Sequence, residues 1–184
     1  FEILSEIGWK PGESFSVEVI PCITALSAVA SLVGAPLTHD FAAVSLSDLL
    51  TPWAVIEKRL HAVGEGDFVV ALYNPQSKRR DWQLKRAQEI LLKYKTPATP
   101  VAVVKSAYRE GKRIVLTTLD RMAEAEVGML TTILIGNAST FRYRDFLVTP
   151  RGYSGKYDLE SGEILHKGID RPGRSLNRPA DFKP

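Results

Sequence analysis

The sequence predicts an α/β protein whose sheet is mixed. Up to Pro97, β-branched apolar runs ended by turn residues alternate with longer segments that fit helices, which is typical of buried parallel strands joined by helical crossovers. After Pro97 three strand-like runs follow one another closely, and the turn 109–112 between the first two predicts an antiparallel hairpin. A sheet that contains both patterns is mixed.

The predicted elements alternate from residue 16 onward. The expected strands are 16–20, 42–48, 67–73, 100–107, 113–119 and 131–137. The expected helices are 23–32, 52–63 and 81–94.

The two ends of the chain differ from this pattern. The first residues form an amphipathic helix with Phe1, Ile3, Leu4 and Ile7 on one face, and they lack an initiator Met. This start indicates either a piece of a longer protein or a processed or engineered boundary. Beyond Pro150 the chain fills with Gly, Pro and charged residues, so we expect an extended tail that packs through Tyr153, Tyr157 and Ile164 at most.

Composition narrows the function classes. The single cysteine and three histidines offer neither a disulfide framework nor a metal-ligand cluster, so no metal site is expected. A net charge of +3 is too small to indicate nucleic-acid binding. Neither a membrane span nor a signal peptide is recognisable, so we expect a cytoplasmic protein.

Small residues are concentrated in the segment VEVIPCITALSAVASLVGAPLTHDF, residues 17–41. In one interpretation they only allow the Ala-rich face of a helix to lie flat against a sheet. In the other, the strand-to-helix turn binds a ligand through free backbone N–H groups, and Thr24 and Ala25 open the helix beneath that ligand.

The segment ALYNPQSKRRDW, residues 71–82, also has two interpretations. Tyr73 and Asn74 end a predicted buried strand, so they either lie at the carboxyl edge of the sheet where open α/β folds bind ligands, or form an ordinary Asn-Pro turn. The basic run after them, which includes Arg79 and Arg80, either is a solvated helix face or binds a polyanionic substrate.

Further candidates follow other strands. Ser106 and Ala107 end one strand, at a ligand site or simply in a hairpin, and Gly136 and Asn137 end the last one. His39 is a candidate general base or a hydrogen-bonding loop residue. No Ser/His/Asp order, carboxylate pair or Gly-rich phosphate loop is recognisable, so the chemistry should need little from side chains.

These motifs resemble the tetrapyrrole methylases, S-adenosylmethionine (SAM) enzymes that methylate precorrins and related macrocycles. The segment 17–41 is similar to the family's strand–PGxTA–helix–GxPLTH pattern. The segments SLSDLLTPWAVIEKRL, DFVVALYNPQSKRRDWQL, MLTTILIGNAST and VTPRGYSGKY resemble the branch that methylates C-17 of precorrin-3B or cobalt-factor III with ring contraction, on the route to cobalamin. The resemblance covers about residues 1–157.

The resemblance implies two α/β domains with SAM in the cleft between them, in a homodimer. Residues 1–45 would be the end of the first, SAM-binding domain, 46–150 the second domain and 151–184 the tail. The family's GxGPG and GDP loops would lie upstream of Phe1, so a chain with these boundaries is expected to bind SAM poorly.

Site residues follow from the resemblance position by position. Thr24, Ala25, Leu72, Tyr73, Asn74 and Ala107 would contact the adenosyl group through backbone or shape. Cys22 stands where the family's turn has Gly, and if that turn needs a positive φ its Cβ costs about 1 kcal/mol. The substrate is a polycarboxylate, for which Arg79, Arg80 and Arg109 are the candidate ligands, and His39 is the candidate proton donor or acceptor of ring contraction.

Two other functions stay open. The chain could be a non-catalytic remnant or subunit that serves dimerisation or tetrapyrrole binding. It could also be a superfamily methylase that acts on a modified protein histidine, which the YNP and TPRGY segments disfavour.

Overall fold

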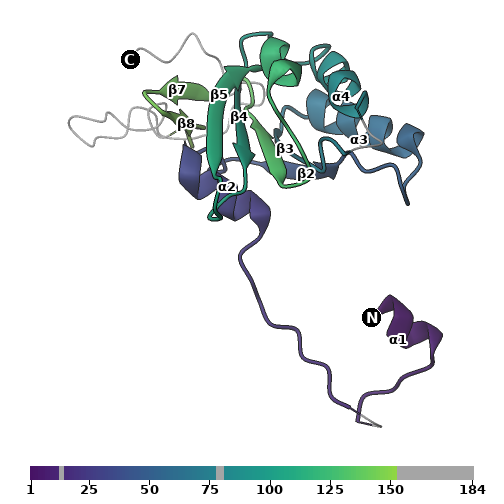
Figure 1. The fold of residues 1–184 in the computed structure, drawn as a ribbon. Coiled ribbons are helices and arrows are strands. Elements are labelled where there is room, and N and C mark those ends of the chain that lie inside the picture. The colour runs from purple at the N-terminus through teal and green to yellow at the C-terminus, as the bar shows by residue number, and fades with distance from the viewer. Residues whose placement is uncertain (13–14, 78–80, 153–184) are drawn as a thin grey trace, which may run out of the picture.

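A computed structural model describes residues 1–12, 15–77 and 81–152 of the 184-residue chain. Its centre is a five-stranded sheet in the order β2-β3-β6-β4-β5 (Figure 1). The strands are β2 (Phe41–Ser45), β3 (Val69–Tyr73), β6 (Thr131–Ile135), β4 (Pro100–Lys105) and β5 (Arg113–Thr118). β2 and β3 are parallel and every other neighbouring pair is antiparallel, which confirms the predicted mixed sheet.

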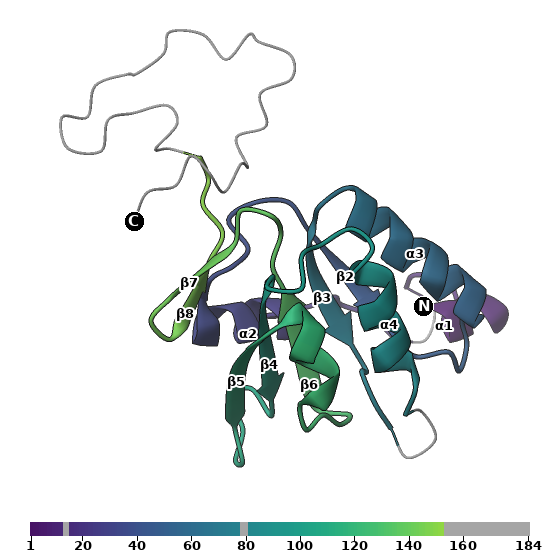
Figure 2. The same cartoon turned by 90° about the horizontal axis from the view of Figure 1, so that it is seen from above.

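Helices cover both faces of this sheet (Figure 2). The helices α3 (Trp53–Glu65) and α4 (Gln83–Leu91), with the 3-10 helix η1 (Leu119–Glu124), pack on one face, and α2 (Ala25–Val33) packs on the other. Successive strand residues serve opposite faces: Val70 and Leu72 are in the apolar cluster beneath α3 and α4, whereas Ala71 is in the cluster beneath α2. Because both faces are buried, β3 is an uninterrupted apolar run.

A second, small sheet follows α2. It consists of β1 (Gly34–Ala35), β8 (Phe146–Val148) and β7 (Phe141–Tyr143), with β1 parallel to β8 and β7 antiparallel to it. Gly34 has a φ of +118°, and a Cβ on it would lie 2.7 Å from the carbonyl oxygen of Leu147. Glycine therefore permits the close approach of β1 to β8.

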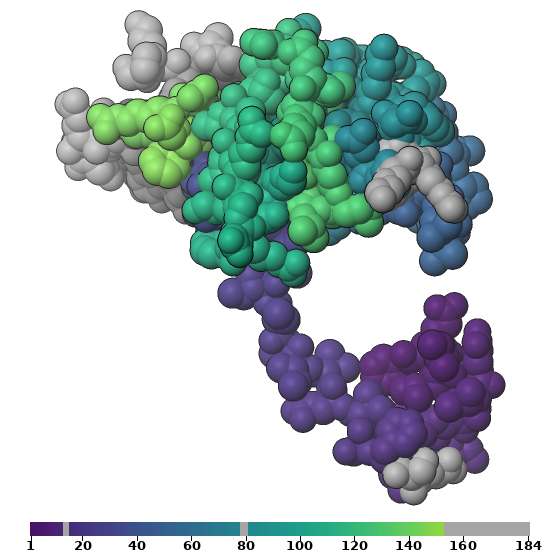
Figure 3. Space-filling view, in the orientation of Figure 1, coloured from purple at the N-terminus to yellow at the C-terminus, as the bar shows by residue number. Residues whose placement is uncertain are grey.

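The described N-terminal residues lie apart from this body. The short helix α1 (Glu2–Glu6) and the extended segment that joins it to α2 project from the rest of the molecule (Figures 1 and 3). The apolar face expected for this helix is not covered, since Phe1, Ile3 and Ile7 are exposed.

The element order agrees with the sequence prediction except at its start. The segment 16–20 is not a strand, because it pairs with no strand of the described residues, and Val17, Val19 and Ile20 are exposed. β2 pairs with β3, so the five-stranded sheet includes residues on both sides of the expected domain boundary at residue 45, and the division into domains stays a prediction. The contacts expected for Tyr153, Tyr157 and Ile164 lie outside the described residues.

Across the described ranges, no helix is both long enough and apolar enough to span a membrane.

Candidate functional site

A pocket of about 430 Å³ lies at one edge of the sheet, where β3 and β4 end and β6 begins. β6 is antiparallel to both neighbours, so its first residues lie beside their last: Thr132 is level with Tyr73, and Thr131 with Lys105. The residues that line the pocket are Ile23, Ala25, Ala28, Val29, Tyr73, Asn74, Val104, Ser106, Ala107, Arg109, Met129, Leu130, Thr131 and Thr132. The carboxyl edge predicted to bind a ligand therefore does carry a pocket.

The first turn of α2 forms one wall of this pocket. Two side chains satisfy N–H groups that have no acceptor within the helix: Thr24 Oγ1 accepts from the Ser27 N–H at 3.3 Å, and Tyr73 Oη accepts from the Leu26 N–H at 3.0 Å. Ala25 and Ala28 also line the pocket, and their side chains are no larger than a methyl group. A ligand can thus approach the α2 backbone closely.

The opposite wall consists of two strand ends that turn sharply. Asn74 has a φ of +51° and Ser106 a φ of +53°, a left-handed conformation that is uncommon for residues other than glycine. Asn74 Nδ2 donates to Ser45 Oγ at 3.1 Å, and the Ser106 N–H donates to the Leu130 carbonyl at 2.9 Å. These bonds hold both strained turns against the pocket.

Of the lining residues that the structure describes, Arg109 alone carries a charge. Its backbone N–H donates to the Ser106 carbonyl at 2.9 Å, and its position in the chain is exposed to solvent. The other lining residues are either apolar or carry an uncharged hydroxyl or amide group. Among the described residues, the pocket therefore offers a single guanidinium, that of Arg109, to an anionic ligand.

The structure brings together six of the residues singled out in the sequence, which all line the pocket: Ala25, Tyr73, Asn74, Ser106, Ala107 and Arg109. The pocket also contains Met129, Leu130, Thr131 and Thr132, which were not among the predicted site residues. The expected strand 131–137 contained the signal that could have found them, because an antiparallel strand beside 67–73 begins where that strand ends.

Three other candidates do not line the pocket. Leu72 is fully buried beneath α3 and α4, because its side chain points to the opposite face from Tyr73. Thr24 is adjacent, as the N-cap of α2. His39 lies at the amino end of β2, where its Nδ1 accepts from the Asp40 N–H at 2.9 Å, and this edge is the opposite one from the pocket.

Gly136 and Asn137 are at the opposite edge too, because they follow the end of the antiparallel β6. Arg79 and Arg80 lie outside the described residues. Cys22 is not among the described residues with positive φ, so its Cβ adds no strain of the expected kind.

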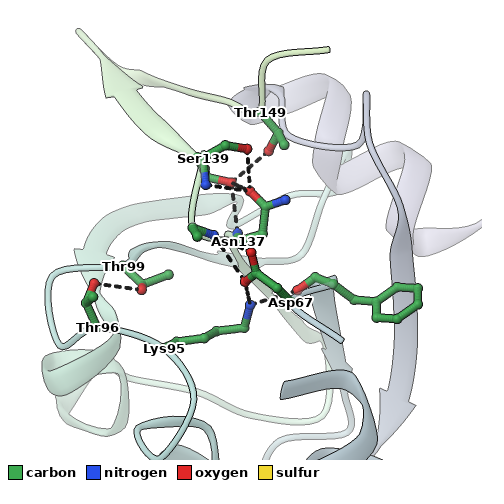
Figure 4. A network of polar contacts seen from close by, with 10 residues as sticks. Asp67, Lys95, Thr96, Thr99, Asn137, Ser139 and Thr149 are labelled. Atoms are coloured by element: carbon green, nitrogen blue, oxygen red, sulfur yellow. Dashed lines mark hydrogen bonds and ion pairs between the residues drawn. The ribbon is translucent and has the colours of Figure 1, made fainter. Parts of the chain in front are cut away.

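The edge opposite the pocket contains a buried ion pair (Figure 4). Lys95 Nζ donates to Asp67 Oδ1 at 3.0 Å and to the Phe68 carbonyl at 2.9 Å, and the Ala138 N–H lies 3.1 Å from each oxygen of the same carboxylate. Burial lowers the pKa of Lys95. The hydrogen bond and the negative charge of Asp67 raise this pKa, but by less than burial lowers it. In the described part of the chain no group of His, Cys, Asp and Glu side chains could hold a metal ion.

The comparisons with known proteins agree with this architecture. Residues 3–123 match the family model of the Tetrapyrrole (Corrin/Porphyrin) Methylases. The chain belongs to this family. The crystal structure of the methyltransferase CobJ superimposes with a TM-score of 0.71 and 35% sequence identity, over 81% of this chain and 62% of that one.

Two curated members of the tetrapyrrole methylases are closer in sequence. The cobalt-factor III methyltransferase of Priestia megaterium is 54% identical over 163 residues, which span 89% of this chain and 30% of that protein. The probable cobalt-factor III C(17)-methyltransferase of Salmonella typhimurium is 51% identical over 152 residues, which span 83% of this chain and 63% of that protein. The chain thus spans less than two thirds of the length of each.

Proposed function

We propose that this chain is part of a SAM-dependent methyltransferase that acts on cobalt-factor III, or on its metal-free counterpart precorrin-3B, in cobalamin biosynthesis. The proposed reaction is C-17 methylation with ring contraction. The observation that carries the proposal is sequence identity above 50% to two relatives named for cobalt-factor III methylation, in a chain where four of the six expected cofactor residues line one pocket.

The pocket fits the adenosyl part of SAM. Ala25, Ala28 and Ala107 leave room along two walls, and Asn74, Thr131 and other polar residues supply hydrogen-bonding groups among apolar surfaces. This mixture of apolar walls and a few polar groups is typical of small-molecule and cofactor pockets of this size. When bound, SAM supplies an activated methyl group on its sulfonium.

The role of this chain is then to position the reactants. Methyl transfer needs the acceptor carbon in line with the bond from sulfur to the methyl carbon, and fixed orientation alone can lower the barrier by several kcal/mol. Arg109 is the charged group at the pocket and would hold a carboxylate of the macrocycle. Arg79 and Arg80 stay candidates for the same task, whereas the position of His39 at the far edge of the sheet argues against a part in ring contraction.

We further place the protein in the cytoplasm as a homodimer with no nucleic-acid or membrane partner. The modest net charge and the single cysteine support this assignment, together with the resemblance to the methylases described above.

Titration with 5′-methylthioadenosine tests the proposal, because this compound carries the adenosyl group without the methionine part. We expect chemical-shift changes in two-dimensional NMR spectra that centre on Ala25, Asn74 and Ala107. Ala107→Leu fills the pocket and should weaken binding at least tenfold, whereas the matched change Ala54→Leu on the exposed side of α3 should leave the Kd unchanged. Shifts that are absent, or that centre on another surface, would overturn the assignment of the pocket.

A further inference from the structure

The hydroxyl of Tyr73 joins two elements that are distant in sequence. Tyr73 is the last residue of β3. Its hydroxyl oxygen accepts a hydrogen bond at 3.0 Å from the N–H of Leu26, which lies 47 positions earlier in the chain. That N–H is one of the first in α2 and has no acceptor within the helix. The phenol oxygen therefore acts as an acceptor at this contact.

A phenol hydroxyl has one proton to donate in addition to its acceptor capacity. Because the Leu26 N–H supplies the proton of the Tyr73–Leu26 bond, the proton of Tyr73 itself is available for another acceptor. Within the described residues Leu26 is the hydrogen-bond partner of this hydroxyl, and the half-buried Tyr73 side chain lines the pocket. A donor is thus held at the pocket wall by a bond that fixes its oxygen.

We propose that the Tyr73 hydroxyl binds the nucleoside of the cofactor, by donating to a ribose oxygen or a purine ring nitrogen. This inference rests on the function proposed above and gives the Tyr73 side chain a direct contact, beyond a contribution of backbone or shape. Its oxygen holds α2 while its proton recognises the ligand.

The alternative to be tested is that Tyr73 only ties α2 to the sheet. Tyr108 provides a matched control, because its hydroxyl lies 2.9 Å from Ser31 Oγ on the same helix, yet Tyr108 is 66% exposed and does not line the pocket. Tyr73→Phe and Tyr108→Phe each remove one oxygen and one hydrogen bond to α2. Only the first removes a donor from the pocket.

The experiment measures the Kd of 5′-methylthioadenosine by NMR titration for the unaltered chain and both variants. Tyr73→Phe should weaken binding about fivefold, as expected for one neutral hydrogen bond, and Tyr108→Phe should change the Kd less than twofold. Analogues that lack one acceptor each, namely the 2′-deoxy, 3′-deoxy, 1-deaza, 3-deaza and 7-deaza compounds, then identify the atom. One of these analogues should bind the unaltered chain about fivefold more weakly than 5′-methylthioadenosine does. The same analogue should bind Tyr73→Phe with the Kd that it has for the unaltered chain, because the hydrogen bond is already absent.

Two results would overturn the inference. In the first, the affinity lost through Tyr73→Phe adds to the affinity lost through the analogue for every analogue. In the second, Tyr108→Phe weakens binding as much as Tyr73→Phe does. If the unaltered chain does not bind 5′-methylthioadenosine, the proposed function fails together with the inference. If the unaltered chain binds and only the pattern expected for Tyr73→Phe is missing, the inference about the Tyr73 hydroxyl fails alone. If Tyr73→Phe does not fold, 3-fluorotyrosine placed at position 73 is the second variant. Its hydroxyl is a stronger donor, so it must tighten binding, and an unchanged Kd contradicts the proposal.

Discussion

Replacing Asp67 with Asn should destabilise the protein more than replacing its partner Lys95 with Met. The reason is the unequal burial of the pair: the side chain of Lys95 is 1% exposed and that of Asp67 is 35% exposed. Asp67→Asn leaves a buried ammonium without a counter-charge. Lys95→Met leaves a carboxylate that still reaches water and still accepts the Ala138 N–H.

The magnitudes follow from this asymmetry. Removal of one partner of a buried ion pair costs about 3–5 kcal/mol, and the partial exposure of Asp67 places Asp67→Asn at the lower end, about 3 kcal/mol. Asn also tolerates the φ of +50° at this position, so the substitution tests the charge and not the backbone. Lys95→Met should cost about 1 kcal/mol. For a chain of this length, the Tm of Asp67→Asn should fall by about 6–12 °C.

Urea unfolding followed by circular dichroism measures both changes in the free energy of unfolding. Glu124→Ala is the control, because the Arg121–Glu124 pair is exposed on both sides and its loss should leave the midpoint unchanged. A larger loss for Lys95→Met than for Asp67→Asn, or a loss below about 1 kcal/mol for Asp67→Asn, would refute the reasoning from burial.

The pH dependence of the same pair has a defined sign. Burial lowers the pKa of Lys95 in the folded state below its ordinary value near 10.5, so just below that pH the unfolded chain binds more protons than the folded one. The contribution of Lys95 to stability therefore rises with pH from the lowered pKa up to the ordinary one. Lys95→Met should lose this rise, and the difference between the two proteins' unfolding free energies measured from pH 8 to 11 checks it.

Three further substitutions test other parts of the structure. Gly34→Ala should cost about 2 kcal/mol in urea unfolding, since its φ is +118° and the new Cβ would lie 2.7 Å from the Leu147 carbonyl oxygen, whereas Gly128→Ala meets no atom within 4 Å and should be nearly neutral. Thr24→Ala removes the cap of α2 and should cost about 1 kcal/mol in the same assay, with Thr24→Ser as the silent control. Arg109→Gln should weaken binding of uroporphyrin, a porphyrin octacarboxylate, about fivefold in a fluorescence titration and leave the Kd of 5′-methylthioadenosine unchanged.

Local sequence pattern was sufficient for most of the sheet and failed where a strand depends on a distant partner. The apolar runs of β3 and β4 and the turn between β4 and β5 contain their own signals, so their positions were predicted within about two residues. The run 16–20 has the same β-branched character, but a strand exists only where another strand accepts its hydrogen bonds. No residue within 16–20 indicates whether that partner is present.

The Asp67–Lys95 pair was not predictable for a related reason. The two residues are 28 positions apart, and a lysine after a helix is most often solvated. Only the packing of the segment after α4 against the loop before β3 buries the ammonium. Sequence pattern reports which side chains are apolar, and it does not report which charges the fold encloses.

The small residues of 17–41 have two competing interpretations, close packing or ligand approach, and α2 carries residues in both kinds of position. Val29, Ala30 and Val33 are buried against the sheet, as the packing interpretation required. Ala25 and Ala28 lie one helical turn apart on the wall of the pocket, where the ligand interpretation places them, and ligand binding there stays a prediction. A helix repeats every 3.6 residues, so a run of small side chains can serve both faces at once, and composition alone could not separate the two. What distinguishes them is the place of the pocket at the ends of β3 and β4, where Tyr73 and Ala107 lie on its wall together with the first turns of α2.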